Sequence, residues 1–214
     1  MTASGLFLLI RINGPYRVML LAMAYRGVRF GEARALQAGD VDLITSRLHV
    51  RRAFSDVAGK LQVVLPKSGK PRTIPIPAYL HAPLMEVLFS CESSDSLLFT
   101  AQKGGPIHYG RWRKSYFDLA SQTVGLQGLT PHDLRRAYAT LSIQAGVGPK
   151  ALRAAMGHSD IRLTMVTYAG VFELDKDDHA ARLSAAAEKA SEDKCSQNVR
   201  SSQPASTDIL TRGC

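Results

Sequence analysis

The chain has 214 residues, 45% of them hydrophobic, and its 27 Lys and Arg against 18 Asp and Glu give a formal charge of +9. That size suits one substantial domain with a tail, and the basic excess favours a polyanionic partner, foremost nucleic acid. The apolar stretch 18–25 is too short to cross a bilayer, and Cys91, Cys195 and Cys214 show neither a disulfide framework nor zinc-ligand spacing, so we expect a cytoplasmic protein.

The predicted elements begin with helices and pass to strands. Residues 16–26 predict a mostly buried helix that ends at Gly27, and a short second helix follows over 31–37. Segments rich in Val, Leu and aromatic residues then predict three strands, over 46–54, 61–66 and 72–76. Pro75 and Pro77 suit a sheet edge or a strand end, so the third strand is expected at the edge of its sheet.

From residue 78 onward the pattern becomes helical. Six helices are predicted, over 78–90, 109–124, 131–145, 150–156, 160–168 and 178–188. Thr130 is a suitable N-cap for the third of them, with Pro131 at its first position. Beyond Ala190 the composition shifts to Ser, Thr, Gln and Asn, so we expect one domain over 1–190 and a flexible polar tail over 191–214.

Arg29 is the first candidate for phosphate chemistry. It lies in Gly27-Val28-Arg29-Phe30-Gly31-Glu32, where the glycines allow a sharp turn between two helices that presents Arg29 in a cleft. The planar guanidinium matches the non-bridging oxygens of a phosphodiester, and Glu32 is placed to hold it. The alternative is an ordinary helix-end arginine paired with a neighbouring glutamate.

A second arginine motif lies in Thr130-Pro131-His132-Asp133-Leu134-Arg135-Arg136. Spacing of three residues puts His132 and Arg135 on one helix face, so both can point at one phosphate, and the helix N-terminus favours an anion. The alternative makes His132 a capping residue and Arg135 a solvated charge. Arg136 is expected to point elsewhere, toward backbone phosphate or solvent.

Lys67 lies at the expected turn between the second and third strands. A lysine on such a turn can deliver a proton to the 5′ oxygen that leaves when DNA is cut. The alternative is a solubilising loop lysine, and Lys70 competes for the role if the register slips.

Tyr168 is the candidate nucleophile, ten residues after His158. A free tyrosine has a pKa of about 10, so adjacent positive charge is needed to activate it. His158 follows Gly157 and can donate a hydrogen bond to the phosphate. The alternatives are a tyrosine that packs at a helix end and a histidine that stabilises a helix dipole. No carboxylate or cysteine stands at ligand spacing beside either histidine, so neither a metal nor a cofactor is expected.

Together, in order and in suitable settings, the six candidates indicate metal-independent cutting and rejoining of DNA strands. On these motifs the chain resembles, over roughly residues 10–185, the catalytic domain of the tyrosine recombinases, or phage integrase family. The matching residues are Arg29, Lys67, His132, Arg135, His158 and Tyr168, with Glu32 in support. Residues 1–190 would then be the catalytic domain.

The resemblance implies a mainly α-helical domain with a small antiparallel β-sheet, an α+β fold. It implies an integrase-like enzyme of a mobile element that forms a 3′-phosphotyrosyl bond, binds double-stranded DNA in the nucleoid and assembles as a tetramer on paired DNA sites. The helix after the tyrosine would dock on a neighbouring protomer. Members usually carry an N-terminal helical domain that clasps the DNA, and we expect that domain to be absent here.

Other basic residues are expected to form the DNA-binding face, chiefly through phosphate contacts that weaken with salt. They are Arg51, Arg52, Lys70, Arg72, Lys103, Arg111, Arg113, Lys114, Arg136 and Arg162. Two further readings stay open: a non-catalytic DNA-binding remnant of a recombinase, and a type IB topoisomerase. Binding without a covalent product favours the first, and relaxation of a plasmid that lacks a specific site favours the second.

Overall fold

A computed structural model describes residues 16–157 and Arg162. The chain divides into two compact units, Met1–Val171 and Phe172–Cys214, and the description concerns the first. The tail predicted over 191–214 and the helix predicted over 178–188 lie outside the described residues, as does the helix over 160–168 apart from Arg162.

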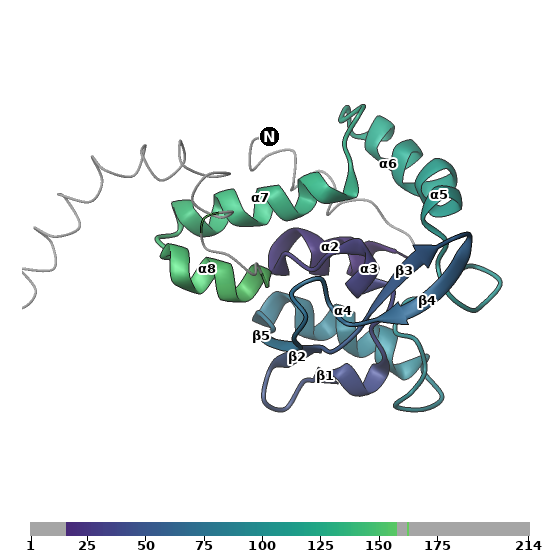
Figure 1. Cartoon of the computed structure of the whole chain (residues 1–214), viewed down its shortest axis with the longest axis horizontal. Helices are drawn as coiled ribbons and strands as arrows, with labels where there is room; N and C mark the ends of the chain where they lie inside the picture. Colours follow the sequence, from purple (N-terminus) through teal and green to yellow (C-terminus); the bar gives the residue numbers. More distant parts are fainter. Residues whose placement is uncertain (1–15, 158–161, 163–214) are drawn as a thin grey trace, which may run out of the picture. The chain divides into compact units, whose positions relative to one another are not determined.

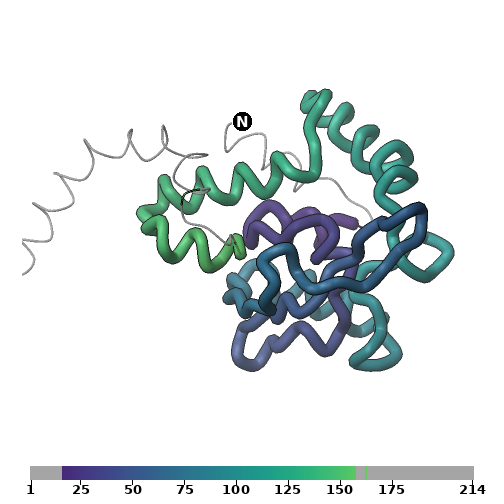
Figure 2. The backbone as a smooth tube through the Cα atoms, viewed as in Figure 1, coloured from purple at the N-terminus to yellow at the C-terminus, as the bar shows by residue number. Residues whose placement is uncertain are grey.

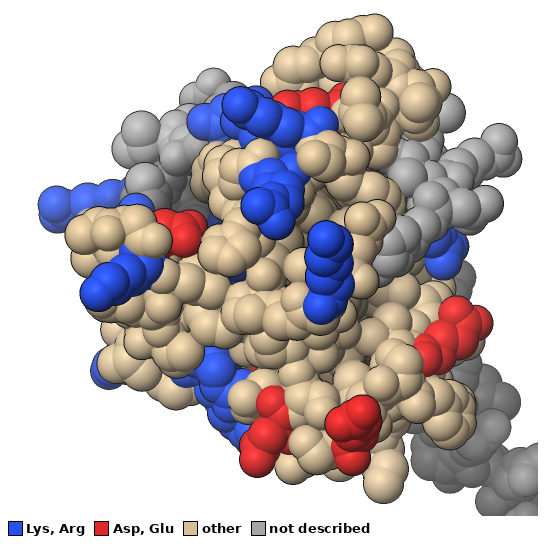
Figure 3. Space-filling view, turned by 90° about the vertical axis from the view of Figure 1, so that its right-hand side faces the viewer, with Lys and Arg blue, Asp and Glu red and all other residues tan. Residues whose placement is uncertain are grey.

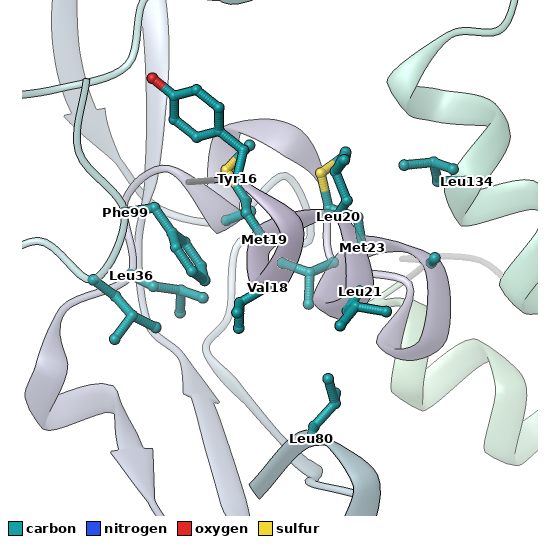
Figure 4. Close-up of a cluster of buried hydrophobic side chains, with 14 of the residues drawn as sticks. Tyr16, Val18, Met19, Leu20, Leu21, Met23, Leu36, Leu80, Phe99 and Leu134 are labelled. Carbon is teal, nitrogen blue, oxygen red and sulfur yellow. The ribbon is translucent and has the colours of Figure 1, made fainter. Parts of the chain in front are cut away.

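Helix α2 (Arg17–Arg26) forms the centre of the described fold. Its residues from Val18 to Ala24 are all buried, because apolar side chains cover every side of the helix. It packs against α7 (Pro131–Gln144), α4 (Ala78–Phe89) and α3 (Phe30–Ala33), as Figure 1 shows. In Figure 4, Leu80 and Leu134 approach α2 from different sides, which joins α4 and α7 to the same core.

Between residues 16 and 157, five short strands form two antiparallel sheets. Strands β1 (Val41–Asp42), β2 (Arg47–Val50) and β5 (Arg72–Pro75) make one sheet in the order β1-β2-β5. Strands β3 (Ala53–Val57) and β4 (Lys60–Val64) form a separate hairpin. The prediction that the proline-containing strand lies at an edge is confirmed.

The predicted strand over 46–54 is wrong as a single element, since it is two strands that belong to different sheets. The alternation of buried and exposed residues stops at Arg51 and Arg52, because both arginines turn to the buried Asp40, at 3.1 and 2.8 Å. The predicted hairpin between 61–66 and 72–76 is also wrong. Strand β4 pairs with β3, and β5 pairs with β2.

The β3–β4 hairpin is attached to the core through the buried Arg34, which follows α3. Its guanidinium donates to the carbonyl of Phe54 at 3.1 Å and to the carboxylate of Asp56 at 3.0 Å, and also to the carbonyl of Ile107. Helix α3 is shorter than predicted, because Leu36 accepts a hydrogen bond from the 97–98 segment instead of continuing the helix.

The other helices predicted within residues 16–157 are present. The run over 109–124 consists of α5 (Tyr109–Trp112), a π-helical turn η2 (Arg113–Phe117) and α6 (Asp118–Thr123). A 3-10 turn, η1 (Ala38–Asp40), precedes β1. Helix α7 begins after Thr130, whose hydroxyl and N–H both donate to Asp133, and α8 (Pro149–Met156) ends at Gly157 with φ 61°.

The mainly helical fold with small antiparallel sheets is therefore as expected. No helix in the described part of the chain is long and apolar enough to cross a membrane. In the backbone trace of Figure 2, the green end of α8 reaches the purple segment that follows α2. Arg135 of α7 also bonds to this segment, at Gly27, so three separate stretches of chain meet there.

Candidate functional site

Three of the six predicted catalytic residues line one cavity of about 220 Å³. Arg29 comes from the turn between α2 and α3, and His132 and Arg135 come from the first turns of α7. Its wall is completed by Phe30, Tyr109 and Pro131. The cavity therefore combines two guanidinium groups and an imidazole with aromatic and apolar walls.

The α2–α3 turn that presents Arg29 depends on Gly27. This residue has φ 61°, a conformation that side chains rarely adopt, and a Cβ placed there would lie 2.4 Å from a ring carbon of Tyr138 on α7. Two residues later, Arg29 is in extended conformation and caps α3. Its guanidinium donates to Glu32 at 3.0 Å and to the carbonyl of Gly157 at 3.1 Å, so the predicted contact with Glu32 is confirmed.

Arg135 is almost completely buried, with 2% of its surface exposed. Its guanidinium donates to the carbonyls of Gly27 and Met156. Arg29 donates to the same Met156 carbonyl, at 3.4 Å. Carbonyls at a helix C-terminus have no partner within the helix and carry partial negative charge, so the end of α8 can hold two like charges close together.

Glu32 is fully buried beneath the two arginines that it binds, Arg29 and Arg72. Arg72 donates to both of its carboxylate oxygens, at 2.9 and 2.7 Å, and the Arg29 N–H adds a bond of 2.9 Å. Burial acts to raise the pKa of Glu32, but the hydrogen bonds and charges of Arg72 and Arg29 outweigh it and hold the pKa below its usual value. Glu32 is therefore a carboxylate at neutral pH.

Arg72 was expected on the DNA-binding face, but the structure places its side chain inside, with only 9% exposed. Sequence reasoning missed this contact, although a signal was present. Arg72, Ile74 and Ile76 alternate along the strand and so share one face, and both isoleucines are buried. The register pairs Arg72 with the buried Val50, which confirms the inward direction.

His132 lies on the first turn of α7 and is itself exposed. Partial desolvation lowers its pKa, and the positive charges of Arg135 and Arg136 lower it further. The imidazole is therefore neutral at pH 7, with one nitrogen able to accept a proton.

Of the other three predicted catalytic residues, only Lys67 is described, and it does not line the cavity. Lys67 is exposed in the connection between β4 and β5, not in a hairpin turn as predicted. His158 and Tyr168 lie outside the described residues. The described chain reaches Gly157, immediately before His158, and the Gly157 carbonyl is bound by Arg29.

The remaining candidates for the DNA-binding face have varied surroundings. Arg51 and Arg52 pair with Asp40, Arg113 with Asp118, and Arg136 with Asp133. Arg51 and Arg136 are exposed despite these ion pairs, and the other exposed candidates are Lys70, Lys103, Arg111, Lys114 and Arg162. On the face shown in Figure 3, Lys and Arg gather over the upper middle, while Asp and Glu lie mostly along the lower edge.

A larger cavity, about 420 Å³, lies between α5 and the 101–108 loop. None of the four described catalytic candidates lines it, and Tyr16, Trp112 and Tyr116 form its aromatic wall. The residues that line the 220 Å³ cavity, and not its volume, therefore identify it as the candidate site. Within residues 16–157 there is no cluster of three or more His, Cys, Asp or Glu that could hold a metal ion.

Comparison with protein families gives one match over most of the chain, the phage integrase family, across residues 11–174. The integrase of Mycobacterium phage L5 is 31% identical over 157 residues, which cover 70% of this chain and 42% of that protein. The tyrosine recombinase XerA of Thermococcus kodakarensis is 28% identical over 170 residues, 78% of this chain and 55% of its own. The chain thus spans roughly half the length of these relatives.

Solved structures show the same fold. The Tn1549 transposon integrase, in complex with transposon right end DNA, matches with a TM-score of 0.68 at 21% identity, over 77% of this chain and 59% of its own. The catalytic domain of bacteriophage HP1 integrase matches with a TM-score of 0.56 at 18% identity, over 85% of this chain and 92% of its own.

Proposed function

The chain belongs to the phage integrase family of tyrosine recombinases, and on that premise we propose that it cleaves and rejoins DNA strands through a 3′-phosphotyrosyl intermediate. The observation that carries the proposal is the convergence of Arg29, His132 and Arg135 on one cavity from two distant segments. Two guanidinium groups and a neutral imidazole suit a phosphodiester better than they suit a metal or a neutral ligand.

The two arginines would stabilise the charge that develops during attack at phosphorus. A phosphodiester attacked by an oxygen passes through a five-coordinate state with charge on its non-bridging oxygens. Arg29 and Arg135 are held in place before the substrate arrives, through main-chain carbonyls of Gly27, Met156 and Gly157. Such preorganised donors in a partly dry site act more strongly than donors in water.

The covalent step would use Tyr168 as nucleophile. The phenol oxygen bonds to phosphorus while its proton passes to the neutral His132, and the bond from phosphorus to the 5′ oxygen breaks. Lys67 supplies the proton that the leaving 5′ oxygen takes up, and His158 donates a hydrogen bond to the phosphate. The ester keeps the energy of the broken bond, so attack by a 5′ hydroxyl reseals the strand without ATP.

Double-stranded DNA is the proposed partner, and the basic residues outside the cavity would contact its phosphates. The DNA held by the Tn1549 integrase supports this partner. Exchange between two sites would need four protomers, two on each site. Residues 1–190 would act as the catalytic domain, with 191–214 as a polar tail.

The test is a pool of nicked duplexes with randomised sequence around the nick, which traps a covalent product because the short released strand diffuses away. We expect a protein–DNA adduct that resists SDS, and its loss in Tyr168→Phe. Equal adducts from both proteins would refute the role of Tyr168. Binding without an adduct would indicate a non-catalytic remnant, and relaxation of any supercoiled plasmid would indicate a topoisomerase.

A further inference from the structure

We propose that Arg72 is a positioning residue that neutralises Glu32 and so keeps Arg29 available for the phosphate. The inference rests on the proposed function and assigns Arg72 a task other than contact with DNA. Arg72 lies on strand β5 and connects it to two other elements. It binds helix α3 through the carboxylate of Glu32, and it binds the end of α8 through the Ala155 carbonyl, which accepts a hydrogen bond from Nε at 3.0 Å.

Glu32 needs a cationic partner for both of its carboxylate oxygens. A fully buried carboxylate is costly unless its oxygens are paired, and a planar guanidinium that donates to both oxygens pairs it best. Arg72 has that geometry, at 2.9 and 2.7 Å. Arg29 reaches Glu32 through only one guanidinium nitrogen, at 3.0 Å, and through its main-chain N–H.

Because Arg72 pairs with Glu32, part of the Arg29 guanidinium stays free of that carboxylate. An arginine side chain has five N–H donors, and three of those of Arg29 are used, by Glu32, Met156 and Gly157. Among the described residues no further acceptor contacts it. The side chain is 22% exposed and lines the cavity, so its remaining donors are available to a phosphate oxygen.

Loss of Arg72 would change the partners of Glu32. Glu32 would then have Arg29 as its sole cationic partner among the described residues, and pairing with both oxygens would draw that guanidinium out of the cavity. The end of α8 would lose support as well, because Arg72 packs directly on Gly157. A Cβ at Gly157 would lie 3.0 Å from an Nη of Arg72. Both catalytic arginines would move, since both are anchored on Met156 or Gly157.

The experiment compares the full chain with Arg72→Gln, Arg72→Lys and the double variant Arg72→Gln/Glu32→Gln. Arg47→Gln is the matched control, because Arg47 lies on the adjacent strand β2, is exposed, and bonds only the Ser46 carbonyl in the described part of the chain. Binding of inorganic phosphate is followed through the NMR signals of the arginine side chains. Adduct formation under single-turnover conditions and DNA affinity over a salt series are measured separately, and thermal unfolding establishes that each variant is folded.

We expect Arg72→Gln to weaken phosphate binding about tenfold and to slow adduct formation by up to about 100-fold, the scale for a displacement of 1 Å. Arg72→Lys should be nearly as slow, because lysine keeps the charge without the planar fork. The double variant should regain part of the phosphate binding, because no carboxylate then competes for Arg29, although the contact of Arg72 with the end of α8 is still missing. DNA affinity should stay within about twofold of the unaltered chain, and any drop in its salt slope should be restored in the double variant, whereas loss of a direct phosphate contact by Arg72 would lower the slope by about one in both variants.

Several results would overturn the inference: no phosphate binding by the unaltered chain, equal binding by Arg72→Gln, no recovery in the double variant, or a salt slope that is reduced in Arg72→Gln and not restored in the double variant. The proposed function fails separately. If no Tyr168-dependent adduct forms but phosphate binding falls in Arg72→Gln and returns in the double variant, the strand-transfer proposal is wrong and the task of Arg72 stands.

Discussion

Replacement of Gly27 by alanine adds one methyl group at the turn that presents Arg29, and the structure sets its cost. An alanine in the left-handed conformation at φ 61° loses about 1–2 kcal/mol. The added Cβ also lies 2.4 Å from the Tyr138 ring, which is buried in α7, and overpacking of this kind costs about 1–3 kcal/mol more. Gly27→Ala should therefore lose roughly 2–5 kcal/mol of unfolding free energy, the sum of the two.

The matched control is Gly59→Ala, in the β3–β4 turn. Gly59 has φ 76°, but a Cβ there meets nothing within 4 Å, so this variant carries the backbone strain without the clash. Urea unfolding measures both stabilities. Gly27→Ala should also slow adduct formation, because the Gly27 carbonyl anchors Arg135, whereas Gly59→Ala should not. Equal losses of stability in the two variants would refute the assigned clash.

Three further predictions concern charge. Because the pKa of Glu32 is lowered in the folded state, its carboxylate contributes stability that is complete above the unfolded pKa of 4.5 and is lost as pH falls. Glu32→Gln should therefore flatten the pH dependence of the urea-measured unfolding free energy between about pH 5 and 3, and an unchanged pH dependence would contradict this. His132 has a lowered pKa, so the rate of adduct formation should fall as pH decreases, with a midpoint below pH 6.5, and His132→Gln should abolish this decrease. A midpoint above pH 6.5 would count against neutral His132 as proton acceptor. Lys114 is exposed, so Lys114→Gln should reduce the salt slope of DNA affinity by about one without slowing the adduct step once DNA is saturating; an unchanged slope would remove Lys114 from the DNA-binding face.

The local motifs were sufficient to predict three of the residues that line the cavity, Arg29, His132 and Arg135. The spacing of His132 and Arg135 follows from one turn of helix, and the Gly27 turn is readable because glycine is needed where φ is positive. The Thr130 cap is equally local, since its partner Asp133 is three residues away. Interactions within one turn depend on geometry that every helix shares, so the sequence alone determines them.

What holds the arginines in place was not predictable from local pattern. Glu32 and Arg72 are 40 residues apart, and the carbonyls that anchor Arg29 are more than 120 residues away. A main-chain carbonyl has no signature in the sequence, because every residue carries one. The prediction of strand pairing was wrong for a related reason. Strand β5 lies next to β2 and not β4, and the apolar pattern of each strand is compatible with either neighbour.

The Met156 carbonyl that Arg29 and Arg135 share has an evolutionary consequence. Because the anchor is main chain, it is encoded by where α8 stops and not by which amino acid stands there. Exchange of one side chain for another at the final turn leaves the acceptor where it is, but insertion or deletion of a single codon in α8 rotates that turn by about 100° and shifts it by about 1.5 Å. During evolution, α8 should therefore accept amino-acid substitutions in its final turn far more readily than insertions or deletions that change its length.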